Sequence, residues 1–258
     1  MSAITLAFES FGKSDQPALI ILHGFFASSR NWRQMARKLA DNHHVYVLDL
    51  RNHGLSAHSS VMDYPSMVDD LALFMDEQGL EKANILGHSM GGKVAMWFVL
   101  NYPERVNKLI VADISPVAYQ HSFDQTIQAL IDLPLDKISN RKQADEFLSA
   151  IIPELAYRQF LLQNLQLVDG QYSWRIDLET FYHNADNIIG FPSVELVTAF
   201  IDEVLFVMGG NSNYTDTEAI KHSFPNAKIM AIEGASHWLH VDSPDKFFSH
   251  SNDFLEKK

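Results

Sequence analysis

Six short apolar runs, the first four separated mainly by segments of helical pattern, constrain the fold of this chain more than any other feature. The runs are ALIIL (18–22), VYVLDL (45–50), ANILG (83–87), KLIVAD (108–113), VLFVMG (204–209) and KIMAI (228–232). Continuous apolar runs of this length are typical of strands buried on both faces of a sheet. Apolar residues recur at helical spacing in three segments, 32–41, 64–79 and 90–103. Because strands that alternate with helices form parallel sheets, we predict an α/β fold with a mostly parallel central sheet flanked by helices.

The alternation stops between residues 116 and 199. No long apolar run occurs there, and four segments have helical character: 123–133, 140–152, 153–165 and 178–190. The stretch LQLVDGQYSW (165–174) predicts a short hairpin, because Asp169-Gly170 is a favoured two-residue turn. We therefore predict an α/β core formed by residues 1–115 and 200–258, interrupted by a helical cap insertion at 116–199.

Charge and composition exclude several classes of partner. The net charge of −12 argues against a nucleic-acid ligand, which needs a positive face. The chain has no cysteine, so disulfides and thiolate metal sites are absent, and it contains neither HExxH nor a G-x-G-x-x-G dinucleotide motif. No apolar stretch reaches the ~18 residues that cross a bilayer. We expect a cytoplasmic monomer or small homo-oligomer without metal, cofactor or membrane insertion.

The sequence GHSMGG at 87–92 places a serine in a predicted strand-to-helix turn. Residues 87–91 fit the pattern G-x-S-x-G, with an apolar run before and a helical segment after, which is the context this motif requires. In such a sharp turn the residues two before and two after the serine are crowded, so only small side chains fit. The turn would expose the Ser89 hydroxyl at the carboxyl edge of the sheet, near the N–H groups that begin the helix. We interpret Ser89 as a nucleophile.

Four motifs together resemble those of the α/β-hydrolase family. HGFF (23–26) follows a strand as the oxyanion loop of that family does, and DLRNHGLS (49–56) is similar to its D-x-R-x-x-G-x-S stretch. GHSMGG is similar to the nucleophile elbow, and GASHWLHVDSP (234–244) to the loop with the catalytic histidine. The elements RNHG and GGNS further resemble the small YbfF-type bacterial esterases, whose relatives act on short acyl esters and acyl-CoA thioesters. The resemblance implies an α/β-hydrolase fold with an inserted cap.

A serine hydroxyl needs a base and an orienting carboxylate. His237 follows the last predicted strand, in the loop that lies above the elbow in such hydrolases, and we expect it to be the base; His240 could serve as a structural hydrogen-bond partner. The family usually carries its aspartate in G-x-x-D after the seventh strand, but this chain reads GGNS there, with Ser212 at the expected position. Two replacements stay open: Asp113, at the end of the neighbouring strand, which we favour, and Asp216, which could instead cap a helix.

The remaining predicted residues form the oxyanion hole and the pocket. We expect the backbone N–H groups of Phe25 and Met90 to stabilise the oxyanion, and we predict pocket contacts from Phe26, Trp174 and Trp238. Asp49 and Arg51 are expected to pair structurally. Basic residues of the insertion could hold a phosphate or carboxylate over the entrance: Arg141, Lys142, Arg158 and Arg175.

These expectations describe a serine carboxylesterase that acts on short-to-medium acyl esters, with acyl-CoA thioesters as a further possibility. Ser89, His237 and Asp113 would form the catalytic triad and pass through an acyl-enzyme. Two alternatives stay open at this stage. A C–C bond hydrolase or lactonase could use the same triad, because a fold does not fix its chemistry. A ligand-binding homologue without turnover would account for the serine at 212.

Overall fold

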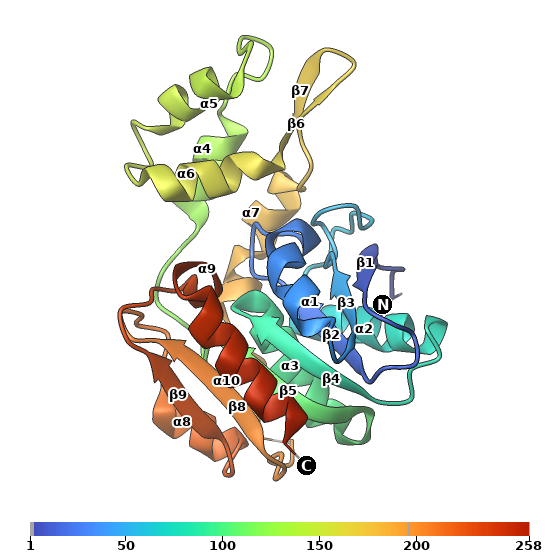
Figure 1. Ribbon diagram of the computed structural model, residues 1–258. Helices are drawn as coiled ribbons and strands as arrows, with labels where there is room; N and C mark the ends of the chain where they lie inside the picture. Colours follow the sequence, from blue (N-terminus) through green and yellow to red (C-terminus); the bar gives the residue numbers. More distant parts are fainter. Residues whose placement is uncertain (1–2, 196, 258) are drawn as a thin grey trace.

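The computed structural model describes residues 3–195 and 197–257 of the 258-residue chain. Figure 1 shows a sheet with helices on both faces and a smaller part above one end of it, joined to it by the segments that leave β5 and return to β8. The smaller part holds the helices of the predicted insertion.

In the described residues, the central sheet has seven strands in the order β1-β3-β2-β4-β5-β8-β9. All six predicted strands are present: β2 (Ala18–Leu22), β3 (His44–Leu48), β4 (Ala83–His88), β5 (Val106–Ala112), β8 (Val204–Gly209) and β9 (Lys228–Ile232). They pair in parallel. The additional strand β1 (Phe8–Phe11) pairs antiparallel to β3 at the edge. Its alternating exposed and half-buried residues lack the continuous apolar run by which the other strands were predicted.

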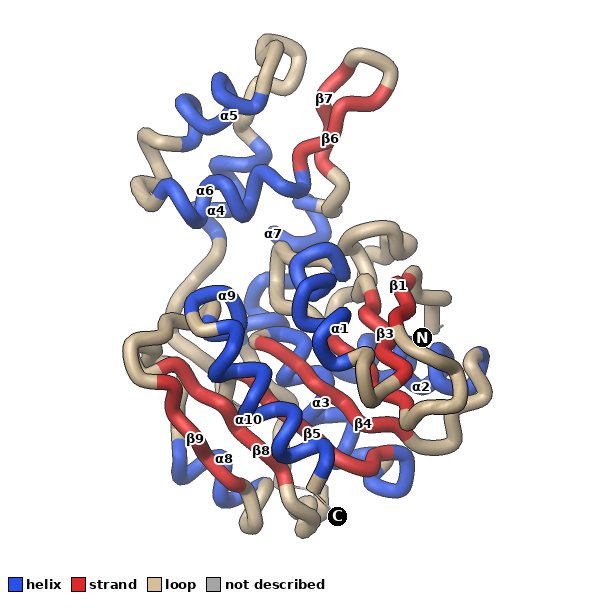
Figure 2. The backbone as a smooth tube through the Cα atoms, in the orientation of Figure 1, coloured by secondary structure: helices blue, strands red, loops and turns tan. Residues whose placement is uncertain are grey.

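Helices cover both faces of the sheet, as Figure 2 shows. On one face lie η1 (Ser29–Trp32), α1 (Arg33–Leu39), α9 (Leu239–Asp242) and α10 (Pro244–Glu256); on the other lie α2 (Tyr64–Glu77), α3 (Met90–Asn101) and α8 (Thr217–Ser223). A short helix, η2 (Pro103–Arg105), connects α3 to β5. Alternate residues of β2 serve the two layers: Leu19 and Ile21 pack with α1 and α10, and Ile20 with the α2 and α3 side. This alternation explains why the strands are apolar throughout.

The insertion consists of short helices and one hairpin. The four predicted helical segments contain α4 (Asp124–Ile131), α5 (Arg141–Leu148), α6 (Leu155–Leu161) with η3 (Leu162–Asn164), and α7 (Leu178–Ile189). The predicted hairpin is β6 (Leu165–Val168) and β7 (Gln171–Trp174). Asp169 and Gly170 have φ of 49° and 80°, as a type I′ turn requires. The division into two domains at residues 115/116 and 199/200 stays a prediction.

Two buried acidic side chains, Asp49 and Asp70, hold the loop after β3 in place. The predicted pairing of Asp49 with Arg51 was wrong. Arg51 does not pair with Asp49: it donates from Nε and Nη2 to the two carboxylate oxygens of Asp70, both at 2.7 Å. Asp49 instead accepts backbone N–H groups of Ser29 at 2.6 Å and Leu55 at 2.9 Å. The aspartate thus fixes the start of η1, beside the loop that follows β2.

Candidate active site

The turn between β4 and α3 holds Ser89 in a strained conformation. Ser89 has φ 52° and ψ −120°, in the region that residues with a side chain rarely adopt. A Cβ added to Gly87 would lie 2.3 Å from the carbonyl oxygen of Gly91, and one added to Gly91 would lie 2.4 Å from that of Leu22. No side chain fits at these distances, so the crowding expected two residues before and after the serine is present.

A chain of hydrogen bonds joins three side chains that come from distant parts of the sequence. His237 Nε2 lies 3.0 Å from Ser89 Oγ, and His237 Nδ1 lies 2.7 Å from Asp113 Oδ2. A carboxylate only accepts, so Nδ1–H donates to Asp113 and the lone pair of Nε2 faces the serine hydroxyl. The three residues follow β4, β5 and β9, whose carboxyl ends lie at one edge of the sheet.

The carboxylate of Asp113 is fully buried and accepts two further hydrogen bonds. Its Oδ1 accepts the backbone N–H of Gly209 at 2.7 Å, and its Oδ2 accepts the hydroxyl of Ser212 at 2.5 Å. Ser212 occupies the position where the resemblance places an aspartate, and sequence reasoning did not foresee that it supports the replacement. Asp216 lies elsewhere: it caps α8 by accepting the N–H of Ala219 at 2.9 Å. The structure therefore brings Asp113, and not Asp216, to His237.

Two backbone N–H groups beside Ser89 have no hydrogen-bond partner among the described residues: those of Phe25 and Met90. The next residue, Phe26, has φ 61°, and its N–H donates to His53 Nε2 at 3.3 Å, so it is not free. Gly24 passes so close to the serine that an added Cβ would lie 3.2 Å from Ser89 Cβ. These are the two N–H groups predicted for an oxyanion hole.

Two buried histidines lie beside His237. His88 Nε2 donates to the backbone carbonyl of His237 at 2.8 Å, and burial lowers its pKa well below the usual value. The ring of His240 stacks on Trp32, with centroids 4.2 Å apart and planes at 10°. Its Nδ1 has no hydrogen-bond partner among the described residues, so the expected structural hydrogen bond is absent at that atom. Burial lowers the pKa of His240 to about 3, so it is uncharged at neutral pH.

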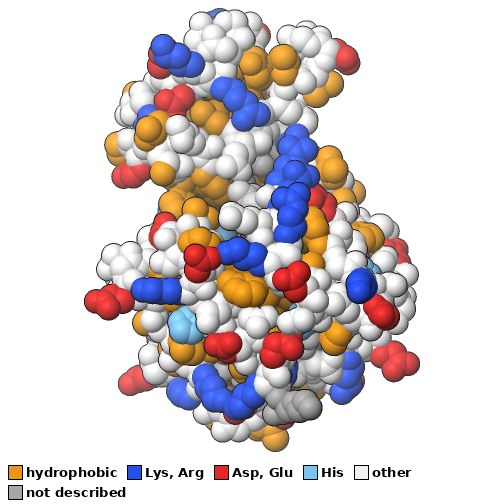
Figure 3. All heavy atoms as spheres, viewed as in Figure 1, with side chains coloured by type: hydrophobic (Ala, Val, Ile, Leu, Met, Phe, Trp, Pro, Cys, Tyr) orange, Lys and Arg blue, Asp and Glu red, His pale blue; other side chains and the backbone are white. Residues whose placement is uncertain are grey.

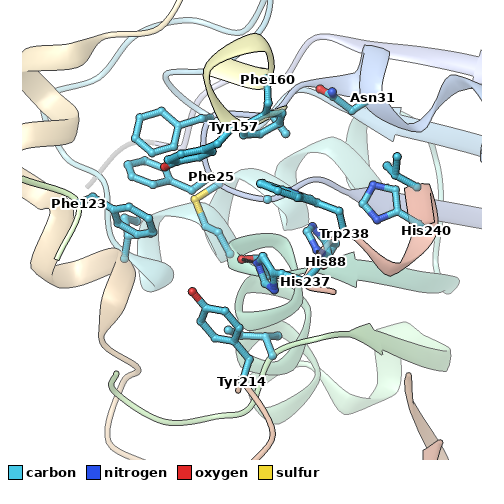
Figure 4. A pocket seen from close by; sticks show the side chains of 18 of the residues that line it. Phe25, Asn31, His88, Phe123, Tyr157, Phe160, Tyr214, His237, Trp238 and His240 are labelled. Atoms are coloured by element: carbon cyan, nitrogen blue, oxygen red, sulfur yellow. Dashed lines mark hydrogen bonds between the residues drawn. The ribbon is translucent and has the colours of Figure 1, made fainter. Parts of the chain in front are cut away.

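Ser89 and His237 open into a cavity of about 760 Å³ between the sheet and the insertion. Aromatic side chains from both sides line it, and Figure 4 shows five of them: Phe25, Phe123, Tyr157, Phe160 and Trp238. Phe26 lines it as well. Phe26 and Trp238 are therefore at the cavity, and their contact with a substrate stays a prediction. Trp174 does not line the cavity, because its indole Nε1 donates to the carbonyl of Leu130 at 3.1 Å inside the insertion. A wall of this composition suits an apolar ligand group.

A buried lysine lies at the cavity wall, and the sequence analysis, which considered only the apolar residues of 90–103, did not predict it. Lys93 donates from Nζ to the carbonyls of Ile189 and Gly190, both at 2.6 Å, and lies 4.8 Å from the ring centre of Tyr119. Burial lowers the pKa of Lys93 to about 7. The lysine ties α3, which begins just after Ser89, to the end of α7, where the insertion returns to the core.

The described residues contain neither a metal-binding cluster nor a membrane-spanning helix. No group of three or more His, Cys, Asp or Glu side chains is arranged there to hold a metal ion. Over the same residues, no helix combines the length and the apolar character needed to cross a bilayer.

The fold and the strand-to-helix serine turn define a family, and comparison with known proteins agrees. The family model described as alpha/beta hydrolase fold matches residues 17–244, so the chain belongs to the α/β-hydrolase family. Within it, the chain is similar to the sn-1-specific diacylglycerol lipase ABHD11 of Danio rerio, with 39% identity over 267 residues, 99% of this chain and 84% of the relative. It is 35% identical to the esterase YbfF of Escherichia coli over 231 residues, 88% of each protein. The solved structure of a marine microorganism esterase matches with a TM-score of 0.93 and 39% identity, covering 98% of this chain and all of that one.

The burial of His240 predicts a specific sensitivity to acid. An unfolded histidine has a pKa of about 6.5, so between pH 6.5 and 3 the unfolded chain binds more protons than the folded one. The free energy of unfolding therefore falls as the pH drops below about 6.5. We expect His240→Phe, which keeps a ring against Trp32, to reduce the stability lost between pH 7 and pH 5 by about 2 kcal/mol.

Urea denaturation at the two pH values measures this difference. His183→Gln is the matched control, because His183 is exposed and its replacement should leave the pH dependence as in the wild type. An equal loss of stability in His240→Phe and wild type would show that His240 does not carry the effect.

Proposed function

We propose that the protein is a serine hydrolase that cleaves carboxylic esters through an acyl-enzyme intermediate. The observation that carries the proposal is the continuous hydrogen-bond chain from Asp113 through His237 to Ser89, at the wall of an apolar cavity. A serine held against a histidine, which is itself held by a buried carboxylate, is the arrangement that activates a hydroxyl for attack on an acyl carbon.

The first half of the reaction acylates the serine. Ser89 Oγ attacks the acyl carbon while His237 Nε2 takes its proton, which requires a hydrogen bond such as the one at 3.0 Å. The negative charge that develops on the carbonyl oxygen is stabilised by the free N–H groups of Phe25 and Met90. His237 then returns the proton to the departing alcohol or thiol. Asp113 keeps the proton on Nδ1 and stabilises the imidazolium without taking a proton itself.

The second half uses water in place of the alcohol. His237 removes a proton from the water, which attacks the acyl carbon, and the proton then returns to Ser89 as the acid leaves. The same N–H pair stabilises the second tetrahedral intermediate. These steps require no metal or organic cofactor.

The aromatic cavity favours a short-to-medium acyl chain as the group that is buried. Its wall is mostly apolar, so binding removes apolar surface of the acyl group from water. The names of the relatives, an esterase and a diacylglycerol lipase, support ester cleavage as the reaction class. The hypothesis of a ligand-binding homologue depended on the missing aspartate at 212, and the hydrogen bond from Ser212 to Asp113 removes that argument.

Removal of the nucleophile tests the proposed function directly. Ser89→Ala deletes the attacking oxygen, and we expect hydrolysis of p-nitrophenyl butyrate to fall by about 10⁴-fold or more, to near the background rate. Steady-state kinetics on the wild type and the variant measure this. Equal turnover by both proteins, or no turnover by the wild type, would contradict the proposal.

The two aspartates considered from the sequence should behave differently. Asp113→Asn keeps the shape but removes the charge that orients His237, and we expect kcat to fall by about 10³- to 10⁴-fold. Asp216→Asn keeps a helix cap that makes no hydrogen bond to the histidine, since asparagine is also a good cap, and kcat should stay within about twofold of the wild type. The same ester assay compares the pair, and similar losses in both variants would overturn the assignment of Asp113.

A further inference from the structure

Two arginines of the insertion lie at the base of the β6–β7 hairpin. Arg141 Nη2 donates to the carbonyl of Leu165, the first residue of β6, at 2.6 Å. Leu165 pairs with Trp174 across the hairpin, and Arg175 follows Trp174 directly. Arg175 Nε is also held, by Gln166 Oε1 at 3.4 Å. These contacts restrain both side chains at the same end of the hairpin.

A third arginine approaches this base from the core. Arg30 is exposed in η1 and precedes Asn31, whose Nδ2 donates to Gln163 Oε1 in η3 at 2.9 Å. The backbone N–H of Arg175 donates to the carbonyl of Asn164, the residue after Gln163, at 2.9 Å. Burial lowers the pKa of Arg175; the positive charges of Arg30 and Arg141 lower it further, and Asp49 raises it. We call Arg30, Arg141 and Arg175 the boundary arginines.

Two carboxylates act on the boundary arginines at longer range, Asp49 on Arg175 and Glu9 on Arg30, but none of the three arginines forms a salt bridge within the described residues. Other basic side chains of the chain do: Arg33 with Glu9, Arg51 with Asp70, Arg105 with Asp76, Lys142 with Glu146 and Arg158 with Asp145. Arg158 and Lys142, which were predicted to lie over the entrance, are thus neutralised within the insertion. Figure 3 shows a column of Lys and Arg side chains across the boundary between the insertion and the core. With 32 acidic against 20 basic residues, three neighbouring arginines without a salt bridge are unexpected in this chain.

The boundary arginines do not themselves line the cavity that contains Ser89, but the bridge beside them does. Asn31 and Gln163, whose side chains bridge the core and the insertion, both line this cavity. Figure 4 places Asn31 at its edge, on the side away from Phe123. Asn31 directly follows Arg30 in the sequence. Gln163 lies two residues before Leu165, whose carbonyl accepts the hydrogen bond from Arg141. A ligand that extends from Ser89 past this bridge would reach the arginines.

We propose that Arg30, Arg141 and Arg175 bind a phosphate group carried by the leaving alcohol or thiol of the substrate. The inference rests on the proposed function, since it assigns the acyl chain to the aromatic cavity and the leaving group to the side of Asn31 and Gln163. Guanidinium groups match phosphate oxygens with paired hydrogen bonds. Three positive charges suit a phosphate dianion better than a single carboxylate. The phosphate could belong to a nucleotide thiol ester or to a glycerolipid headgroup.

Matched substrates with and without phosphate test the site. We compare kcat/KM for butyryl-coenzyme A and the phosphate-free butyryl-pantetheine, and for lysophosphatidic acid and the phosphate-free monoacylglycerol. Arg30→Gln, Arg141→Gln and Arg175→Gln are the variants. Arg37→Gln is the control with the same change of charge. Arg37 belongs to α1, its guanidinium lies over the ring of Phe11, and it is outside the cluster.

Each boundary variant should lose about tenfold or more in kcat/KM on one phosphorylated substrate and less than about twofold on its phosphate-free counterpart. A selective loss on the coenzyme A ester identifies a nucleotide thiol ester, and one on lysophosphatidic acid identifies a glycerolipid. Equal effects on both members of each pair, no effect, or the same loss in Arg37→Gln would overturn the phosphate site.

A binding measurement separates this proposal from the proposed function. Calorimetry of coenzyme A and of lysophosphatidic acid with Ser89→Ala does not need turnover. If coenzyme A or lysophosphatidic acid binds to Ser89→Ala and binds more weakly to the double variant Ser89→Ala, Arg175→Gln, the phosphate site is supported. This holds even if ester hydrolysis is absent. No binding of either ligand overturns it, even if the wild type hydrolyses p-nitrophenyl butyrate.

Discussion

The buried carboxylate of Asp113 is the interaction on which the arrangement of the site depends. It lies just beyond β5 and accepts hydrogen bonds from the Gly209 N–H at the end of β8, from Ser212 and from His237 after β9. A buried charge is costly unless donors compensate it, and here three donors do so, two from the end of β8 and its following turn and one from the loop after β9. The carboxylate therefore fixes the ends of neighbouring strands and the orientation of the histidine at the same time. Its loss would leave the histidine without an orienting partner.

The surroundings of His237 complement this charge. His88 and His240 are uncharged at neutral pH because burial lowers the pKa of each, so neither adds a second positive charge beside the histidine. In the proposed reaction, the aromatic wall of the cavity would exclude water around an acyl group, and electrostatic interactions are stronger in such a medium. The free N–H groups of Phe25 and Met90 would then act with little competition from solvent. The site combines one compensated negative charge with a mostly apolar wall.

Most of the fold could be predicted because its strongest signals are local. Continuous apolar runs marked the strands, although β9 lies at the sheet edge and is mostly exposed, so the expected burial on both faces was wrong there. Asp169-Gly170 marked the hairpin, and Gly87 and Gly91 marked the crowded turn around the serine. The edge strand β1 was missed because four half-exposed residues carry no such signal. Side-chain partners were harder, because they depend on segments that meet only in the fold. The support of Asp113 by Ser212, the position of Trp174 inside the insertion and the buried Lys93 are of this kind.

The central claim is that Ser89 is a nucleophile activated by His237, and covalent labelling tests it most directly. The wild type is treated with a fluorophosphonate at neutral pH, digested and analysed by peptide mass spectrometry. The account predicts one phosphonyl group per chain, located on the peptide that contains Ser89, and labelling that is strongly slowed in His237→Gln. Absence of label from that peptide, modification of another serine instead, or an unchanged rate in His237→Gln would contradict it.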